Sequence, residues 1–360
     1  MKSIATLRKE NKNKRALITG FPGQDATYMA TLLSFLGYGD IILLARRRTE
    51  LVEQRIKALE NVKRVGTKCE VILYDLSVSK EEVSRIIFAT KPDEIYHFAA
   101  RSHVGDSFKR IAEMSDNNIR ATQHLLDAID ERVKFYHAGT SEMLGNGNYY
   151  MLWPNSPYAI AKTYCHQLVN HYRKAMNYKT LSVVTHNHDS PLRGKNFLIP
   201  SLMERMDIAK QIGEDEVKVG NLFTERDYSY AGDIVIDIWW LMQLEEQWEE
   251  SIELGSGVSV SGETIFKKLC EEDYFGIAFM SKYNGSYIRP TDVYKLEANK
   301  ERTYRKGHRR MDFAELLDHM FKLRNTNEKE AISFYINYLN EVFSNYEDTT
   351  TETTVEEDKE

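Results

Sequence analysis

The sequence predicts an α/β fold with a doubly wound parallel sheet, followed by a smaller mixed α/β lobe. Short apolar runs alternate with segments of helical apolar spacing through the first half of the chain, and this alternation breaks up after Pro200. The first apolar run, residues 15–19, leads directly into a glycine turn. Alternating strands and helices with right-handed crossovers form a parallel sheet covered on both faces. At 360 residues, the chain is long enough for such a sheet and a second lobe.

The expected elements follow from these patterns in chain order. Six strands are expected at residues 15–19, 41–45, 71–74, 94–100, 133–137 and 181–185. Helices are expected from the glycine turn to residue 36, at residues 80–90 and 117–130, around Tyr158, and at residues 311–323 and 328–343. Loops of the smaller lobe are expected at residues 220–232, 254–262 and 287–292.

These elements divide the chain into segments. Residues 1–14 are basic and polar without an apolar stretch, so we expect a flexible extension. Residues 15–185 form the sheet domain, with part of residues 225–250 packing back on it, and residues 186–344 mainly form the second lobe. Residues 345–360 are acidic and rich in threonine, which predicts a disordered tail. An apolar stripe predicted to belong to the core consists of Ile234, Ile238, Trp239 and Leu241.

Composition excludes several classes of function. The net charge of −6, with 42% hydrophobic and 28% charged residues, is ordinary for a soluble globular protein and gives no sign of nucleic-acid binding. No run approaches the roughly 20 apolar residues of a membrane-spanning helix, so no membrane association is expected. The cysteines Cys69, Cys165 and Cys270 are widely spaced, which favours a reducing, cytoplasmic location and argues against a structural metal.

The glycine turn predicts a dinucleotide site. Gly20 and Gly23 lie between the first strand and an apolar helix, and Ala26 takes the place of a third glycine. A turn in this position brings backbone N–H groups against a pyrophosphate. We therefore predict that residues 15–185 are the cofactor-binding domain.

The end of the second strand indicates which dinucleotide is bound. Counting about 20 residues from the glycines leads to Asp40, but Asp40 begins the strand and so lies at the wrong edge of the sheet. Residues 46–48, all arginines, follow the strand at the correct edge and suit a 2′-phosphate, so NADP is favoured over NAD. The alternative is a solvated basic surface. Past the third and fourth strands, Asp75 and Leu76 are predicted near the adenine, and Ala100 and Ser102 near the nicotinamide ribose.

A tyrosine and a lysine one helical turn apart predict acid–base chemistry. Tyr158 and Lys162 lie on one helix face, where the ammonium should favour the phenolate and lower the pKa of the tyrosine. A tyrosine with a lowered pKa can take a proton from a sugar hydroxyl. Such pairs also occur by chance, but Thr140 and Glu142 directly follow the fifth strand, at the edge where ligands bind in parallel sheets.

The segment after the sixth strand contains residues that could bind a metal ion. His186, His188 and Asp189 have the close spacing of metal ligands. Because the segment lies at the same edge of the sheet and no further cluster of ligand residues is present, we predict no metal.

With these stretches identified, the chain resembles the extended short-chain dehydrogenase/reductases over about residues 15–320, and most closely the GDP-mannose 4,6-dehydratase family. The segments that carry the resemblance lie at residues 19–25, 102–104, 140–142, 156–162, 187–191, 220–227 and 289–292. Gly23-Gln24-Asp25 and Thr140-Ser141-Glu142 discriminate best, since the glycine turn and the Tyr158/Lys162 pair fit any member of the superfamily.

The resemblance implies a lyase reaction with internal recycling of hydride. Tyr158, assisted by Lys162 and Thr140, would deprotonate the 4-OH of the mannose while NADP takes the C4 hydride. Glu142 would then remove the acidified C5 proton as a general base. Water would leave from C6 after protonation by Glu142 or Tyr158, and the hydride would return to C6.

The resemblance also implies binding roles. The positions that match cofactor contacts of the family are Gly20, Gly23, Gln24, Asp25, Arg46, Asp75, Leu76, Ala100, Ser102, Tyr158, Lys162, His188 and Arg193. The positions that match substrate contacts are Ser141, Asn187, Asn196, Arg226, Arg289 and Asp292, with the two arginines on the diphosphate. The implied partners are a nucleotide sugar and further copies of the chain.

Two departures bear on specificity. Leu192 stands where the family has the first of two arginines, and Ser201 stands where it has a lysine. These family positions help to recognise guanine and the cofactor of a neighbouring subunit. The sequence therefore leaves open the base, the hexose and the choice between a dimer and a tetramer.

Two other functions stay open at this point. A 4-reductase or epimerase acting on a nucleotide sugar would share the fold, the glycine turn and the Tyr158/Lys162 pair, but would not need Glu142 as a base. A nucleotide-binding module without activity would be consistent with the absence of the family's arginine at Leu192 and of its lysine at Ser201. It would not be consistent with the presence of Thr140, Glu142, Tyr158 and Lys162 together.

Overall fold

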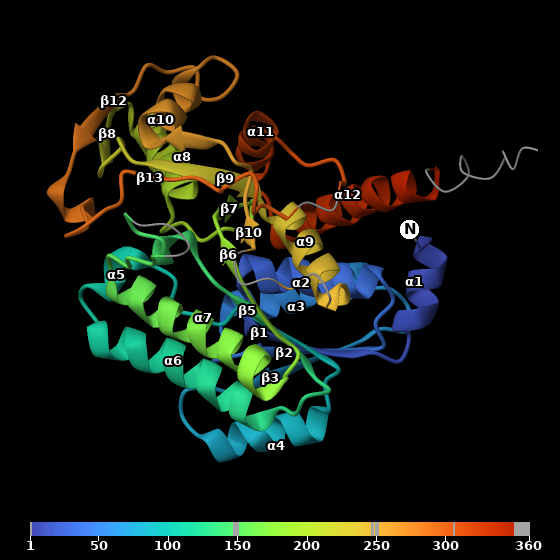
Figure 1. Cartoon of the computed structure of the whole chain (residues 1–360). Helices are drawn as coiled ribbons and strands as arrows, with labels where there is room; N and C mark the ends of the chain where they lie inside the picture. Colours follow the sequence, from blue (N-terminus) through green and yellow to red (C-terminus); the bar gives the residue numbers. More distant parts are fainter. Residues whose placement is uncertain (1, 147–150, 246–247, 249–251, 305–306, 349–360) are drawn as a thin grey trace, which may run out of the picture.

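The fold is a seven-stranded parallel sheet with helices on both faces and a smaller lobe over one edge (Figure 1). The computed structural model describes residues 2–348 except 147–150, 246–247, 249–251 and 305–306. The strand order is β10-β6-β5-β4-β1-β2-β3. The strands are β1 (Arg15–Phe21), β2 (Asp40–Ala45), β3 (Lys68–Leu73), β4 (Glu94–His97), β5 (Lys134–Ala138), β6 (Thr180–Thr185) and β10 (Glu253–Leu254). The predicted doubly wound sheet is therefore confirmed.

Two layers of helices cover the sheet. One layer contains α2 (Gln24–Phe35), α3 (Glu50–Val62), α9 (Ala231–Gln243) and α12 (Glu328–Asp348), and the other contains α4 (Lys80–Thr90), α6 (Ile111–Ala128) and α7 (Pro157–Met176) (Figure 1). Leu17 and Ile18 are both fully buried, one in each core, because successive strand residues point to opposite faces. Both faces of the strands are covered, which explains their continuous apolar runs.

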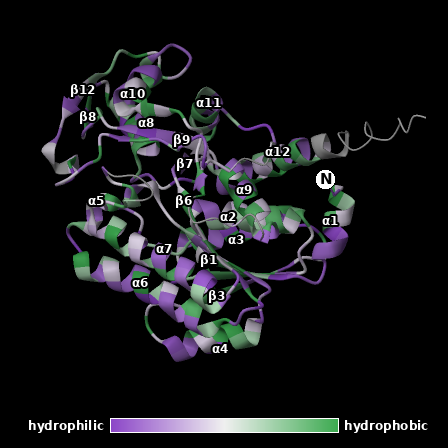
Figure 2. Ribbon diagram, viewed as in Figure 1, coloured by the Kyte–Doolittle hydropathy of each residue, from purple (hydrophilic) through white to green (hydrophobic). Residues whose placement is uncertain are grey.

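The helices of the second layer are amphipathic. In Figure 2, α4, α6 and α7 each combine hydrophilic and hydrophobic residues, as expected of helices with one face on a sheet and the other in solvent. By contrast, the stripe on α9 is almost completely buried, which confirms that Ile234, Ile238, Trp239 and Leu241 belong to the core. None of the helices in the described ranges is long and apolar enough to cross a membrane.

The start of α7 is set by its first residues. Ser156 Oγ accepts a hydrogen bond from Ala159 N at 3.1 Å, and Pro157 occupies the first helical position, where its missing N–H costs nothing. Tyr158 consequently lies in the first turn and Lys162 one turn later, both buried.

The smaller lobe lies over the carboxyl ends of the sheet strands (Figure 1). Its strands are β7 (Asn187–Asp189), β9 (Glu225–Tyr230), β11 (Ser259–Ser261), β13 (Lys295–Leu296) and the separate pair β8 (Glu216–Val219) and β12 (Met280–Tyr283). Its helices are α8 (Leu198–Ile212), α10 (Gly262–Cys270) and α11 (Phe313–Leu323). Two short helices, α5 (Val104–Ser107) and η1 (Ser141–Met143), follow β4 and β5.

Two of the expected loops contain strands. Residues 220–232 include β9, which is central to the lobe, and Leu254 belongs to β10, which pairs with β6 as the seventh strand of the main sheet. The loop predictions were wrong there. A two-residue strand is too short to show a period, and the buried Arg226 and Asp227 of β9 hide its apolar pattern.

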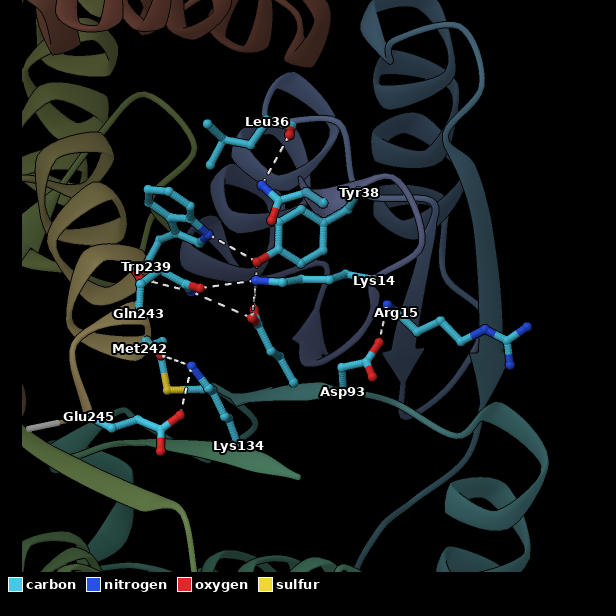
Figure 3. Close-up of polar contacts among 12 residues, drawn as sticks. Lys14, Arg15, Leu36, Tyr38, Asp93, Lys134, Trp239, Met242, Gln243 and Glu245 are labelled. Atoms are coloured by element: carbon cyan, nitrogen blue, oxygen red, sulfur yellow. Dashed lines mark hydrogen bonds and ion pairs between the residues drawn. The ribbon is translucent and has the colours of Figure 1, made fainter. Parts of the chain in front are cut away.

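The prediction of a flexible extension over residues 1–14 was also wrong. Helix α1 (Ile4–Asn11) begins after the N-cap Ser3 and buries Leu7 against the core. Asn11 Nδ2 donates a hydrogen bond to Leu36 O at 3.2 Å, and Lys14 Nζ lies 3.0 Å from Glu94 Oε1 (Figure 3). One apolar side chain per turn is too weak a signal to distinguish a short docked helix from a tail.

Glu94 organises the amino-terminal edge of the sheet. This buried carboxylate accepts hydrogen bonds from the hydroxyls of Tyr38 and Tyr96, each at 2.7 Å, in addition to Lys14. Trp239 Nε1 donates to Tyr38 Oη at 3.0 Å, which connects α9 to the same cluster (Figure 3). The cluster closes the edge opposite the smaller lobe.

The end of the chain differs from the expected disordered tail in one respect. Residues 345–348 form the last turn of α12, so that part of the prediction was wrong, while residues 349–360 lie outside the described residues.

Candidate active site

A large cavity lies between the sheet and the smaller lobe. Its volume is about 1050 Å³, and it is lined from the carboxyl ends of β1, β4, β5 and β6 and by segments of the lobe. A typical ligand pocket measures roughly 300–1,000 Å³, so this cavity has room for a large ligand or for two ligands side by side.

The glycine turn forms one wall. Gly20 has a φ of +87°, and a Cβ there would lie 2.7 Å from Ala99 N, so only glycine fits. A Cβ on Gly23 would lie 2.9 Å from Gly20 O. Gly23 is the N-cap of α2, whose first N–H groups have no partner within the helix. Close backbone packing and a helix N-terminus together suit a pyrophosphate.

Gln24 and Asp25 connect this turn to β7. Gln24 Nε2 donates to His188 O at 2.8 Å, Ser190 Oγ donates to Gln24 Oε1 at 2.8 Å, and His188 Nε2 lies 3.1 Å from Asp25 Oδ2. Burial alone would raise the pKa of Asp25, but the adjacent His188 and Arg193 outweigh it and lower that pKa. Burial likewise opposes the charged form of His188, yet Asp25 raises the pKa of that imidazole. The two residues therefore form a charge pair at the cavity wall.

Arg193 lies beside this pair. Its Nε is 3.0 Å from Asp189 Oδ1, and its guanidinium stacks 3.5 Å from the centre of the Phe197 ring. Burial raises the pKa of Asp189, and the Arg193 charge opposes this shift. Stacking and ion pairing hold the guanidinium in a fixed plane, ready for a flat or anionic ligand.

Tyr158 faces the same cavity with its phenol beside Thr140 and Glu142. Burial raises the pKa of Tyr158, a hydrogen bond with Thr140 opposes that shift, and the Glu142 carboxylate adds to it. The expected lowering of this pKa by Lys162 is therefore not found in the protein alone. Lys162 Nζ instead lies 3.3 Å from His137 Nε2, and burial lowers the pKa of Lys162 to about 8.

Glu142 lies opposite two arginines of the smaller lobe. Its Oε1 is 3.4 Å from Arg289 Nη1 and 3.8 Å from Arg226 Nη2, and its side chain is 13% exposed. Asp292 Oδ1 shares the same cations, at 2.8 Å from Arg226 and 3.6 Å from Arg289. Arg226 Nη1 also donates to Val293 O at 2.9 Å. This group therefore brings two guanidinium groups and two carboxylates together at the cavity wall.

Most of the residues that the sequence nominated line this cavity. They are Gly20, Gly23, Gln24, Asp25, Ala100, Ser102, Thr140, Glu142, Tyr158, Lys162, Asn187, His188, Arg193, Asn196, Arg226, Arg289 and Asp292.

Four nominated residues do not line it. Ser141 is 1% exposed within η1, and Leu76 is buried in the core between α4 and α6. Asp75 accepts hydrogen bonds from the backbone and hydroxyl of Ser77. Arg46 is exposed just past β2. Asp75, Leu76 and Arg46 all lie beyond the strands that carry the cavity, so a role for them requires a ligand that extends along the sheet edge.

The histidines after β6 have separate partners. His186 Nε2 lies 2.8 Å from Glu253 Oε2, His188 pairs with Asp25, and Asp189 pairs with Arg193. Within the ranges that the structure describes, no group of three metal-ligand residues comes together.

Three arginines of the cavity, Arg55, Arg205 and Arg324, were missed from the sequence. Arg55 of α3 is 4% exposed, and it contacts Glu328 of α12, Pro22 O and Leu192 O. Arg205 of α8 lies over the Tyr287 ring, 4.4 Å from its centre, and donates to Ser201 Oγ. Arg55 shares a helical face with the buried Val52 and Leu59. A charged residue on an otherwise apolar helical face could have been recognised in the sequence as a candidate functional residue.

The doubly wound sheet, the glycine turn, and the buried tyrosine and lysine at the cavity are the features of an extended short-chain dehydrogenase/reductase. The solved structures agree with this class at the level of the fold. A dTDP-glucose 4,6-dehydratase of Streptomyces venezuelae has a TM-score of 0.70 at 18% identity, covering 86% of this chain and 96% of that chain. A UDP-glucose 4-epimerase of Bifidobacterium longum has a TM-score of 0.72 at 17% identity, covering 88% and 99%.

Sequence comparison narrows the class to one family. The family model described as GDP-mannose 4,6 dehydratase matches residues 17–320. A GDP-mannose 4,6 dehydratase of Drosophila melanogaster is 30% identical over 343 residues, covering 87% of this chain and 86% of the relative. One of Cricetulus griseus is 34% identical over 267 residues, covering 70% and 71%. The chain belongs to the GDP-mannose 4,6-dehydratase family, a family of lyases.

Proposed function

We propose that this chain converts GDP-D-mannose to GDP-4-keto-6-deoxy-D-mannose and water, with NADP as a recycled cofactor. The observation that carries the proposal is that Tyr158 and Glu142 open into one cavity, with the glycine turn at one end and Arg226 and Arg289 at the other. A reductase or epimerase needs the tyrosine but not a second base, so Glu142 favours elimination.

The side chains would divide the acid–base work. Tyr158 would take the proton of the 4-OH, with Thr140 hydrogen bonded to its phenol and the Lys162 ammonium favouring the phenolate. Glu142 would remove the C5 proton, which the neighbouring 4-keto group makes acidic. Glu142 or Tyr158 would then protonate the departing C6 hydroxyl. Each role requires a group that can hold and release a proton inside one cavity.

A nicotinamide dinucleotide would fit the wall formed by the glycine turn. Gly20 and Gly23 leave no space for side chains, and the N-terminus of α2 suits the pyrophosphate. When bound, NADP supplies the hydride acceptor for C4 and returns the same hydride to C6. Gln24, Asp25, His188 and Arg193 would hold it, and the exposed Arg46 would meet a 2′-phosphate, which is why NADP is proposed over NAD.

The substrate would lie towards the smaller lobe. Arg226 and Arg289 would bind the diphosphate, since two guanidinium groups already share the carboxylates of Glu142 and Asp292 and can accept a stronger anion. Asn187, Asn196 and Asp292 would contact the sugars. We propose a homodimer or homotetramer in the cytoplasm, a reducing compartment of the kind that the three widely spaced cysteines favour.

Turnover on GDP-mannose tests the proposal. The folded protein, supplied with NADP and no external reductant, should yield a nucleotide sugar lighter by one water, detected by mass spectrometry. Glu142→Gln should lower this rate by about 10²–10⁴-fold, the usual contribution of a general base, while NADPH still binds. Glu142→Gln at full rate, or the same protein acting only as an epimerase, would overturn the assignment.

A further inference from the structure

A row of polar side chains crosses the sheet beneath Lys162. Thr19, His97, His137 and Ser182 occupy registered positions on four neighbouring strands, β1, β4, β5 and β6. Registered neighbours in a parallel sheet share a face, and this is the face that α6 and α7 cover. All four residues are 0–1% exposed. Polar groups buried this deeply must satisfy one another.

The first hydrogen bonds of this row start at Lys162. Its Nζ lies 3.3 Å from His137 Nε2, and His137 Nδ1 lies 2.9 Å from Ser182 Oγ. An ammonium can only donate, so His137 Nε2 must accept. A neutral imidazole has one donor and one acceptor, so His137 Nδ1 carries the proton and donates to Ser182.

A second chain of bonds reaches Ser182 from the other side. Arg173 Nη2 donates to Asn170 Oδ1 at 3.2 Å, so the Asn170 amide nitrogen is the group that faces His166 Nε2, at 3.1 Å. His166 Nε2 must therefore accept, and His166 Nδ1 donates to Ser182 Oγ at 2.9 Å. Ser182 Oγ thus accepts from both histidines. Because a guanidinium and an ammonium end the network, neither histidine can reverse its tautomer.

We propose that His137, fixed in one neutral tautomer between Lys162 and Ser182, is a positioning residue that holds the Lys162 ammonium at the cavity wall, where Tyr158 and the cofactor would meet it. This inference rests on the proposed function. A carboxylate in this place would also hold the ammonium, but its charge would compete with the phenolate for the cation. A neutral acceptor orients Lys162 and leaves its charge available to Tyr158.

The surroundings keep His137 neutral. Burial lowers the pKa of His137 well below its usual value, and Lys162, His97 and His166 lower it further. Burial also lowers the pKa of His97, to about 3, with Lys162 adding to the shift. Near Lys162 itself, Cys165 favours the charged form. No acidic residue is among the groups that shift these pKa values, so a neutral acceptor is what the described surroundings offer the ammonium.

Nitrogen NMR of the unmodified protein tests the arrangement without turnover. Long-range 1H–15N spectra at pH 7 should assign His137 and His166 as neutral Nδ1–H tautomers. The Lys162→Met variant removes the donor to His137 Nε2, so it should release that preference at His137 and leave it at His166, whose Nε2 still faces the Asn170 amide. A His137 that is an imidazolium, or that carries its proton on Nε2, would overturn the proposal even if the protein dehydrates GDP-mannose.

Substitution of His137 tests the consequence for Lys162. His137→Leu removes the acceptor, so the Lys162 pKa should fall by about one unit and the alkaline limb of kcat should move down equally, lowering kcat about fivefold at pH 8. NADPH affinity, measured by fluorescence, should weaken over the same pH range. His137→Gln presents an amide oxygen and should restore both profiles. His171→Leu, an exposed position on α7, is the matched control.

The outcomes separate the two proposals. No dehydration of any nucleotide sugar, together with a pH-dependent loss of NADPH affinity in His137→Leu, would refute the function but support the role of His137. Profiles of His137→Leu that match wild type, or a His137→Gln variant as impaired as His137→Leu, would refute the positioning role.

Discussion

His188 Nε2 lies 3.1 Å from Asp25 Oδ2, which joins the helix after the glycine turn to the first strand of the smaller lobe. The pKa of His188 is raised above 6.5, so its contribution to stability is complete below 6.5 and is lost as the pH rises through the raised value. The pKa of Asp25 is lowered below 3.8, so its contribution is complete above 3.8 and is lost on further acidification. The pair should therefore stabilise most between these two values.

The first prediction concerns His188→Gln. This variant should lower the melting temperature most at pH 4–6.5 and progressively less as the pH rises above 6.5, measured by calorimetry from pH 4 upward. The exposed His171→Gln variant is the control and should follow wild type throughout. A difference for His188→Gln that does not depend on pH would show that the imidazole acts without its charge.

The second prediction concerns Arg55 and Glu328, whose Nε and Oε2 atoms lie 2.8 Å apart across 273 residues of sequence. Arg55→Met removes a buried cation that also holds Pro22 O in the glycine turn, so the free energy of unfolding should fall by about 2–4 kcal/mol and KM for NADP should rise. The Glu328→Gln variant and the double variant complete a double-mutant cycle, which measures the interaction energy between the two side chains. Strictly additive effects would contradict a direct interaction.

The third prediction separates stability from activity. Glu94→Ala leaves the hydroxyls of Tyr38 and Tyr96 buried without their acceptor, which should lower the free energy of unfolding by about 3 kcal/mol in urea. The cluster lies at the edge opposite the cavity, so kcat of the folded variant should match wild type. Tyr38→Phe removes one donor and should cost less than Glu94→Ala.

The fourth prediction tests the choice of dinucleotide. Arg46→Ala should raise the dissociation constant for NADPH by about tenfold and leave that for NADH unchanged, because a charge-assisted contact to a phosphate contributes roughly 1.5–3 kcal/mol. Fluorescence titration measures both constants. Equal effects on the two dissociation constants would show that Arg46 does not contact the 2′-phosphate and belongs to a solvated basic surface.

Much of the site was predictable because it depends on chain topology. Gly20 lies at the carboxyl end of β1, and Glu142 and Tyr158 come after β5. The carboxyl ends of parallel strands meet at one edge of the sheet whatever their order. The glycine turn, the segment after β5 and the start of α7 could therefore be placed together from sequence alone. The resemblance to a family then supplied the roles of Arg226 and Arg289 in the more variable lobe.

What could not be predicted depends on contacts between distant segments. Arg55 meets Glu328 only after α12 has packed on α3, and Lys14 meets Glu94 only after β1 has paired with β4. The pKa of Tyr158 could not be predicted for the same reason. The helical spacing shows that Lys162 is near, but it does not show that burial has the largest effect on this pKa. The periodicity of a sequence does not show the strength of such ion pairs or the size of such pKa shifts.

The most direct measurement of the central claim uses GDP-mannose carrying deuterium at C4. If Tyr158 and Glu142 act on one hexose in one cavity while the cofactor recycles, the deuterium should appear at C6 of the 4-keto-6-deoxy product, with none released to solvent and no net NADPH formed. Product without deuterium at C6, or accumulation of NADPH in step with substrate loss, would contradict the account.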